Sequence, residues 1–207
     1  MAQLSVAERE RRYEMFWKRR CAGVFHPTGP EHPHVDVYRY APTWLPWAPE
    51  RRCHVYITGG MADRAMPKLA PDERGRVERI ELCACTRSIR EIEPRRDAVA
   101  TALHALARLP WRQRISFMPL ETVTWGSPFL PDSEMSAFFF AVPPADEDRV
   151  LTQTAEADVV LQVMPITREE REFATREGSL ALVDRFEVAG VPPLVDWDRP
   201  SCVTRAP

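Results

Sequence analysis

The chain has 207 residues, 44% of them hydrophobic and 28% charged, which suits one globular domain that forms its core without disulfides or metals. The formal net charge of −2 provides no overall field that would attract nucleic acid or an anionic membrane. The five cysteines lack the spacing of a disulfide scaffold, and no apolar leader is present, so we expect a cytoplasmic protein.

The first predicted element is a charged helix over residues 6–21. Tyr13, Phe16 and Trp17 fall at positions i, i+3 and i+4, so they form one apolar stripe on this helix. A segment rich in proline and histidine follows over residues 26–33.

Three strands are predicted next. Residues 34–40 alternate with period two, which indicates a half-buried strand. The following residues, 41–50, hold three prolines and are interpreted as a loop. Residues 53–58 and 77–86 are the second and third strands, and Gly59-Gly60 ends the earlier of the two.

The middle of the chain contains the clearest helix pattern, over residues 94–109. Pro94 suits a first-turn position, and Pro110 is expected to end the helix. Residues 115–125 alternate weakly and predict one or two short strands. Residues 137–142 are continuously apolar and rich in Phe, which predicts a central strand covered on both faces.

A strand over residues 158–164 precedes the last two predicted helices. Thr167 and Glu170 have the spacing of a capping box, which places a helix start there. Gly178 is expected to end that helix. Ser179 is a candidate cap for the second helix.

Strands and helices therefore mix without strict alternation. This pattern predicts an α+β fold with one mixed, mostly antiparallel sheet covered by helices. We expect a single domain over residues 1–207, with a proline-rich tail, residues 190–207, that lies extended along the surface.

Three stretches of the sequence resemble the Suppressor of fused domain family. Together they follow the family order from residue 35 to residue 186, although at Gly60 a serine is more usual in the family. They are Val35-Asp36-Val37-Tyr38; Val55-Tyr56-Ile57-Thr58-Gly59-Gly60-Met61 followed by Arg79-Ile80-Glu81-Leu82; and Val163-Met164-Pro165-Ile166-Thr167-Arg168-Glu169-Glu170 followed by Phe173-Ala174, Gly178, Leu182 and Phe186.

The resemblance implies a non-catalytic protein that binds a protein partner. Eukaryotic relatives restrain Gli-type transcription factors by gripping an extended peptide between two lobes, and this chain resembles the first lobe only. Bacterial relatives resemble immunity proteins, which neutralise a cognate toxin of a polymorphic toxin system by binding it. The resemblance therefore implies a bacterial immunity protein, with restraint of an endogenous regulator as the alternative.

The candidate protein-binding residues are two tryptophans and two strand residues. Trp44 and Trp47 lie in the predicted proline-rich loop, where they either anchor a partner or fold back and cap the sheet. Asp36 and Tyr38 share one face of the first predicted strand. They either line a peptide groove or belong to the solvated face.

A metal site built from Cys83, Cys85, His32 and His34 is a weaker alternative. In a regular strand, side chains at i and i+2 lie roughly 6 to 7 Å apart, since the rise is about 3.3 Å per residue. Two thiolates on one zinc lie closer, about 4 Å apart, given bonds of about 2.3 Å. Buried apolar thiols account better for the cysteines, and we expect no metal and no cofactor.

Catalysis finds little support in the sequence. Glu169 and Glu170 are adjacent, so they diverge on a helix and suit its positive N-terminus instead of forming an acid pair. No nucleophile elbow, phosphate loop or zinc-protease motif is present. A thiol enzyme that uses Cys53 or Cys85 with a distant histidine remains the alternative to a non-enzyme.

Overall fold

The computed structural model describes residues 4–27, 33–45, 48–67, 77–93, 96–143 and 150–203. For residues 44, 45, 48–51 and 150 it describes the backbone alone. The elements in chain order are α1 (Val6–Trp17), β1 (Cys21–Phe25), β2 (Asp36–Leu45), β3 (Ala48–Gly59), β4 (Ile80–Thr86), β5 (Glu91–Glu93), β6 (Arg96–Asp97), α2 (Ala98–Gln113), β7 (Thr122–Thr124), β8 (Met135–Ala141), α3 (Val150–Ala155), β9 (Val159–Thr167), α4 (Arg168–Glu177) and α5 (Ser179–Val188).

One seven-stranded sheet organises the described residues, in the order β1-β2-β3-β4-β9-β8-β7. Every neighbouring pair is antiparallel except β4 and β9, which run parallel. A parallel pair needs a long crossover, and here β5, β6, α2, β7, β8 and α3 lie between the two strands in the chain. The α+β prediction with a mixed, mostly antiparallel sheet is confirmed.

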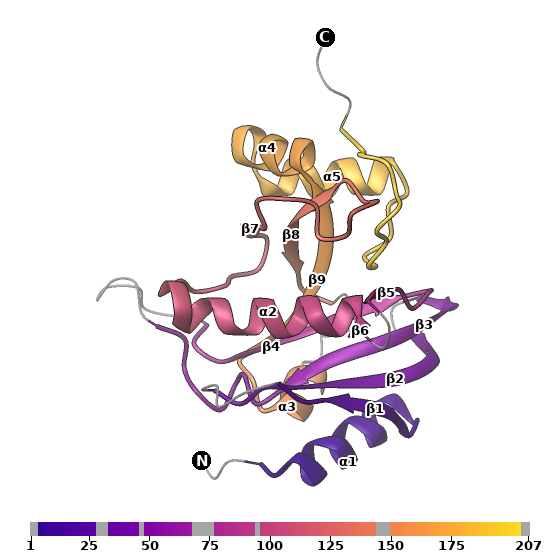
Figure 1. Ribbon diagram of the computed structural model, residues 1–207, viewed down its shortest axis with the longest axis vertical. Helices are drawn as coiled ribbons and strands as arrows, with labels where there is room; N and C mark the ends of the chain where they lie inside the picture. Colours follow the sequence, from indigo (N-terminus) through magenta and orange to yellow (C-terminus); the bar gives the residue numbers. More distant parts are fainter. Residues whose placement is uncertain are drawn as a thin grey trace.

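Helices cover both faces of this sheet, which twists so that β8 and β9 run steeply to β1–β3 (Figure 1). Successive side chains of a strand point to opposite faces. Val37 belongs to the core cluster beneath α2, whereas Tyr38 belongs to the cluster beneath α1 and α3. On β8, Phe138 and Phe139 divide in the same way between the α2 side and the α4–α5 side.

The burial of β2 on both faces corrects the prediction of a half-buried strand. Asp36, Tyr38 and Tyr40 were expected on a different face from Val37, which is right, but both faces are covered. The charged helix α1 covers the second face because its apolar stripe needs burial, and it inserts Tyr13 there.

Residues 41–45 and 48–50 belong to strands and not to the predicted loop, whereas residues 46 and 47 lie outside the described residues. β2 continues to Leu45 and β3 begins at Ala48, with Thr43 opposite Cys53. The register shifts between Tyr40 and Thr43, and Pro42 lies at this irregularity. Proline is tolerated in a strand at such a bulge, so the proline content did not exclude a strand.

The first two predicted helices are present, but their first or last residues differ from the prediction. The first helix is confirmed but stops at Trp17, because Lys18 adopts a left-handed conformation. The helix predicted at 94–109 begins at Ala98, where Asp97 caps it. Pro110 lies inside this helix, which continues to Gln113, so the predicted end was wrong.

The predictions for the C-terminal elements are also right in some respects and wrong in others. The capping box at α4 is confirmed, and Gly178 ends this helix with a φ of 97°. α5 has Gly178, not Ser179, at its N-cap, and no side chain bonds there. The Phe-rich strand is confirmed as β8, covered on both faces.

The proline-rich tail was expected on the surface, but part of it belongs to the core. Leu194, Val195 and Trp197 are buried, and the amide of Val195 donates to the carbonyl of Cys85 at 2.7 Å. The Trp197 ring stacks on Phe129 with centroids 5.2 Å apart. Prolines prevent a regular element here, but they do not prevent burial of the apolar residues between them.

Candidate functional site

Two of the four predicted binding residues are buried in this structure. Asp36 is 1% exposed, and its carboxylate lies under the rings of His26 and His34. Tyr38 is also buried, and its ring packs edge-on against Tyr13. The solvated-face interpretation therefore does not hold. A role of Asp36 and Tyr38 in binding stays a prediction, and it would have to act through the residues they support.

The other two predicted binding residues are Trp44 and Trp47. Trp44 lies on the backbone of β2 opposite Arg52, but its side chain lies outside the described residues. Trp47 lies entirely outside them. Their role as partner anchors stays a prediction.

The thiol and zinc alternatives find no geometric support in the described residues. Cys53, Cys83 and Cys85 lie together in the apolar cluster beneath α1. Burial raises the pKa of Cys85 well above its ordinary value, which disfavours the reactive thiolate. His34 does not join the cysteines but lies against Asp36, and His32 is outside the described residues.

The second of the family-like stretches builds a buried carboxylate cradle at the end of β3. Glu81 accepts hydrogen bonds from the hydroxyl of Thr58 at 2.5 Å and from the amides of Gly60 and Ala62 at 2.9 and 3.0 Å. Burial raises the pKa of Glu81 to about 7, although these donors oppose the rise. The cradle holds the turn after β3 and is closed to solvent.

The third stretch fixes the start of α4. Thr167 and Glu170 cap the helix reciprocally, and Arg199 of the tail grips both carboxylate oxygens of Glu170 at 2.5 and 2.7 Å. The amide of Cys202 donates to Glu170 at 2.9 Å. Burial alone would raise the pKa of Glu170, but the bonds and charge of Arg199 outweigh it and lower that pKa. The first turn of α4 is thereby held in one orientation.

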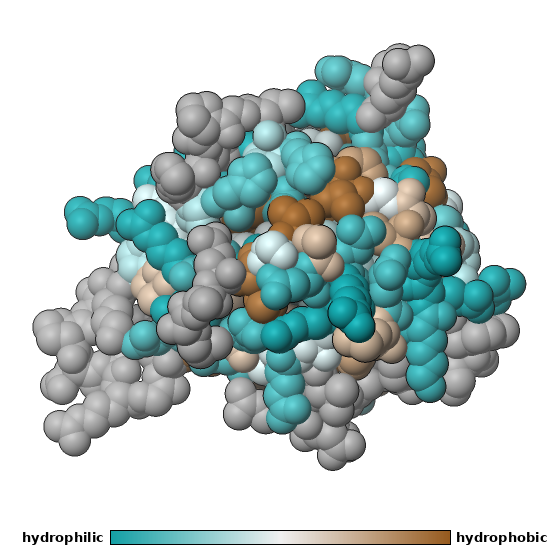
Figure 2. Space-filling model, turned by 90° about the horizontal axis from the view of Figure 1, so that it is seen from below, coloured by the Kyte–Doolittle hydropathy of each residue, from teal (hydrophilic) through white to brown (hydrophobic). Residues whose placement is uncertain are grey.

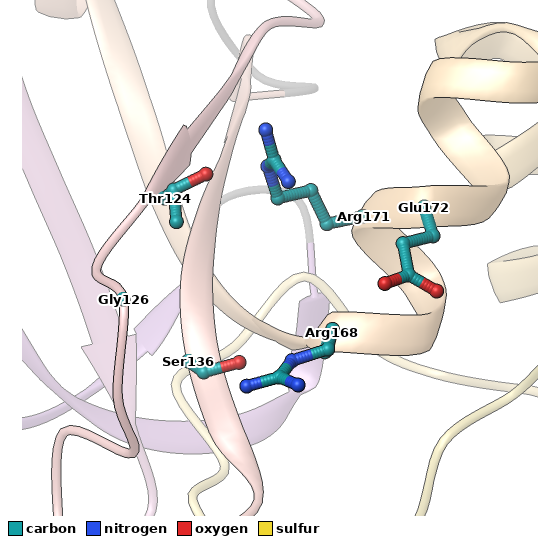
Figure 3. A pocket seen from close by; sticks show the side chains of 6 residues that line it. All are labelled: Thr124, Gly126, Ser136, Arg168, Arg171 and Glu172. Atoms are coloured by element: carbon teal, nitrogen blue, oxygen red, sulfur yellow. The ribbon is translucent and has the colours of Figure 1, made fainter.

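The outer face of this first turn presents two arginines to a cavity of about 280 Å³. Arg168 and Arg171 are three residues apart, so they lie on one side of α4. Figure 3 shows both side chains reaching from α4 toward β7 and β8, where Thr124 and Ser136 stand. Within the described residues, no ion pair joins either arginine to a carboxylate, and the buried Nε of Arg171 has no hydrogen-bond partner. The other residues that line the cavity are Gly126 and Glu172.

An unpaired sheet edge runs beside this cavity. β7 ends the strand order and pairs with β8 only, among the residues described. The amide of Trp125 donates to Ser136 at 2.9 Å, so by the alternation of an antiparallel ladder Val123 also faces β8. The N–H and C=O groups of Thr122 and Thr124 therefore point away from the sheet, where an extended chain could pair with them.

A second surface is the lower face of the molecule, on which α1 lies (Figure 1). Figure 2 shows hydrophobic residues gathered in one region of this face, with hydrophilic residues around them. Val6 and Met15 are the exposed large apolar side chains of α1, but nine positions separate them, so they lie on opposite sides of the helix. α1 offers no continuous apolar stripe to a partner.

Arg168 lies within a family-like stretch of the sequence, but no sequence pattern identified it, or Arg171, as a site residue. The available signal was the capping box, because a fixed N-cap at Thr167 determines which face of α4 each later residue occupies. What the sequence did not reveal is that β7 is an edge strand, since strand order depends on long-range pairing.

Comparisons with known proteins agree with this architecture. The family model of Suppressor of fused protein (SUFU) matches residues 31–200. The crystal structure of a SUFU homologue from Neisseria gonorrhoeae FA 1090 has a TM-score of 0.68 at 20% identity, over 97% of each chain. No curated protein sequence matches the chain.

Two further structures share the fold at low identity. A chain of the Sufu–Fu complex has a TM-score of 0.61 at 13% identity, over 93% of this chain and 89% of that one. Drosophila Suppressor of Fused has a TM-score of 0.53 at 14% identity, over 81% of this chain and 42% of that one. These likenesses show the fold, and the family model covers most of the sequence. The chain belongs to the Suppressor of fused protein family.

Proposed function

We propose that this protein acts by binding another protein, and that an extended segment of the partner pairs with the open edge of β7. The observation that carries the proposal is the outward-facing backbone of Thr122 and Thr124 beside Arg168 and Arg171. Strand addition gives affinity through main-chain hydrogen bonds, and adjacent side-chain sites give specificity.

The chemistry of the cavity favours an acidic side chain in that segment. A guanidinium binds a carboxylate with charge-assisted, often bidentate hydrogen bonds. The hydroxyls of Ser136 and Thr124 supply further donors on the strand side (Figure 3). Glu172 also lines the cavity, so its formal charge is +1 with both arginines, which favours a single carboxylate over a highly acidic segment.

The partner that we propose is a toxin, which this protein would neutralise by binding to it. The resemblance to bacterial immunity proteins implies such a partner. The Neisseria homologue has the same fold over nearly its whole length, which supports a bacterial setting for this architecture. Restraint of an endogenous regulator uses the same surface and is the alternative. Co-expression with a candidate toxin separates the two, because only an immunity protein restores growth.

The side-chain part of the proposal is tested with charge reversal. An array of extended peptides with single Asp or Glu residues serves as the probe, read by fluorescence anisotropy. Arg168→Glu/Arg171→Glu is expected to abolish binding, whereas Arg176→Glu, on the same helix but outside the cavity, is expected to retain it. Equal binding by both variants would exclude the cavity as the binding site.

The backbone part is tested at Thr122. Thr122→Pro removes an outward amide without removing a bond to β8, and proline is tolerated at a strand edge. Thr122→Val keeps the amide and is the matched control. We expect the proline variant to lose peptide binding and the valine variant to keep it. Loss in neither variant would show that the partner does not add a strand here.

A further inference from the structure

A cluster of two histidines and one aspartate lies where β1 leads into β2, on a different part of the sheet from β7. Nδ1 of His26 is 2.8 Å from Oδ1 of Asp36, and Nε2 of His34 is 3.1 Å from the same oxygen. All three ligand atoms lie within 4.8 Å of one another.

The strand register explains why these residues meet. Phe25 pairs with Val37 and Val24 with Tyr38, so the next step of the antiparallel register sets His26 opposite Asp36. His34 precedes Asp36 by two positions, which places both side chains on one side of an extended chain. The cluster therefore joins the end of β1 to the beginning of β2.

The backbone at His34 is closely held from a third strand. Gly60 follows β3 with a φ of 111°, and a Cβ built there would lie 2.4 Å from the carbonyl oxygen of His34. A side chain at position 60 would displace that carbonyl, so glycine is required for this approach. The backbone of His34 is therefore held in place by the turn after β3.

Asp36 contacts both histidines through Oδ1 and carries an unsatisfied second oxygen. Its carboxylate is 1% exposed, and Oδ2 is buried without a hydrogen-bond partner among the described residues. A buried acceptor left without a donor is costly, which points to a further group that it binds. The two histidine side chains are 59% and 52% exposed, so they can turn toward an incoming ion.

The geometry is close to that of a metal site. Bonds of about 2.0 to 2.2 Å in a tetrahedral arrangement place N and O ligands about 3.4 Å apart. The distances of 2.8 and 3.1 Å need only a small separation of Asp36 from each histidine to admit an ion, and the histidine nitrogens lie within 4.8 Å of each other. Two imidazoles with one carboxylate suit Zn²⁺ and neighbouring first-row metals.

We propose that His26, His34 and Asp36 form a binding site for one divalent transition-metal ion, with Zn²⁺ the best match. Three protein ligands leave the fourth position of a tetrahedral ion to water or to a side chain of a partner. The ion would link the end of β1, at His26, to the start of β2, at His34 and Asp36. Binding through both oxygens of the carboxylate would also satisfy Oδ2 of Asp36.

The test is a calorimetric titration of chelator-treated, full-length protein with ZnCl₂, with Co²⁺ absorption as a second readout of the ligand set. We expect one ion per chain. His26→Ala and His34→Ala are each expected to weaken binding at least about tenfold, since even outer-shell changes at metal sites cost 10- to 100-fold. His54→Gln, a substitution of a histidine on β3 outside the cluster, is the control and should bind as the wild type does.

Two outcomes would overturn the proposal: no stoichiometric Zn²⁺ binding by the folded wild type, or binding that survives in His26→Ala/His34→Ala. Circular dichroism shows whether each variant is folded, and Asp36→Asn keeps the shape of the buried side chain if the alanine variants unfold. Peptide binding at β7 is measured on the same proteins. Loss of metal without loss of peptide binding separates this site from the proposed function.

Discussion

At the scale of single residues, the buried carboxyl of Glu81 has an unusual pKa. Burial raises its pKa to about 7, from an ordinary value of 4.5. The folded chain therefore holds this proton more tightly than the unfolded chain does. Stability should fall as the pH rises from about 4.5 toward about 7, and this contribution should be constant above that range.

Glu81→Gln should remove that slope. The amide oxygen of glutamine can accept from Gly60 and Ala62 while its NH₂ group donates to Thr58, so the cradle keeps its bonds. Urea unfolding at a series of pH values between 4.5 and 8 measures the effect. Glu187→Gln, at an exposed position of α5, should keep the wild-type slope. A slope that persists in Glu81→Gln would assign it to another group.

The ion pair of Glu170 with Arg199 leads to the opposite dependence. Its lowered pKa means that the stability Glu170 contributes is present at neutral pH and is lost as the pH falls through the folded-state pKa.

Glu170→Gln should destabilise the protein by about 3 kcal/mol at neutral pH, because it leaves the charge of Arg199 buried without its partner. Chemical denaturation measures this loss. Glu177→Gln removes an acid from the exposed pair with Arg176 and should change little. Equal losses of stability in the two variants would show that the buried ion pair contributes no more than the exposed one.

At the scale of elements, the tail after α5 contributes to the core through one large ring. Trp197 is buried between Phe129, on which it stacks, and Phe138, whose ring meets it edge-on at 6.3 Å. The hydroxyl of Ser133 donates to the Trp197 carbonyl at 2.6 Å, which ties this part of the tail to the turn before β8.

Trp197→Ala should therefore cost about 3 to 5 kcal/mol of stability, as expected for truncation of a buried tryptophan. Val188→Ala, at a position that is 84% exposed, should change stability by less than about 0.5 kcal/mol. Thermal and urea unfolding measure both. A small effect of Trp197→Ala would mean that the tail is dispensable for the core.

Local signals predicted most elements but not their partners. The capping box at Thr167 and the Phe-rich run at β8 were sufficient because each depends on residues close in sequence. Pro42 and Pro110 misled the prediction, since a bulge and a helix interior tolerated them once tertiary packing held the surrounding chain. The cavity at α4 could not be predicted because it needs β7 beside a helix more than forty residues later in the chain.

At the scale of the whole molecule, β9 holds the two halves of the sheet together. It lies between β4 and β8, so it is the strand that connects β1–β4 with β7 and β8. The chain reaches β9 only after the crossover that begins at the end of β4.

None of the helices in the described residues combines the length and apolar composition needed to cross a bilayer.

A fragment ending at residue 143 should lack a cooperative unfolding transition. Without β9, both β4 and β8 lose a neighbour, and the apolar residues of β8 on the α4 side lose the helices that cover them. Circular dichroism melts of the fragment and the full chain make the comparison. A sharp melt of the fragment would show that the β1–β4 half folds by itself.

The ion pair between Arg199 and Glu170 couples the tail to the cavity at α4. The docked tail and the orientation of Arg168 depend on the same first turn of α4. If a partner prefers that orientation, thermodynamic reciprocity requires it to stabilise the docked tail by the same free energy. Amide hydrogen exchange in residues 199–203 should then slow when a ligand occupies the cavity, and clipping the tail should weaken that ligand.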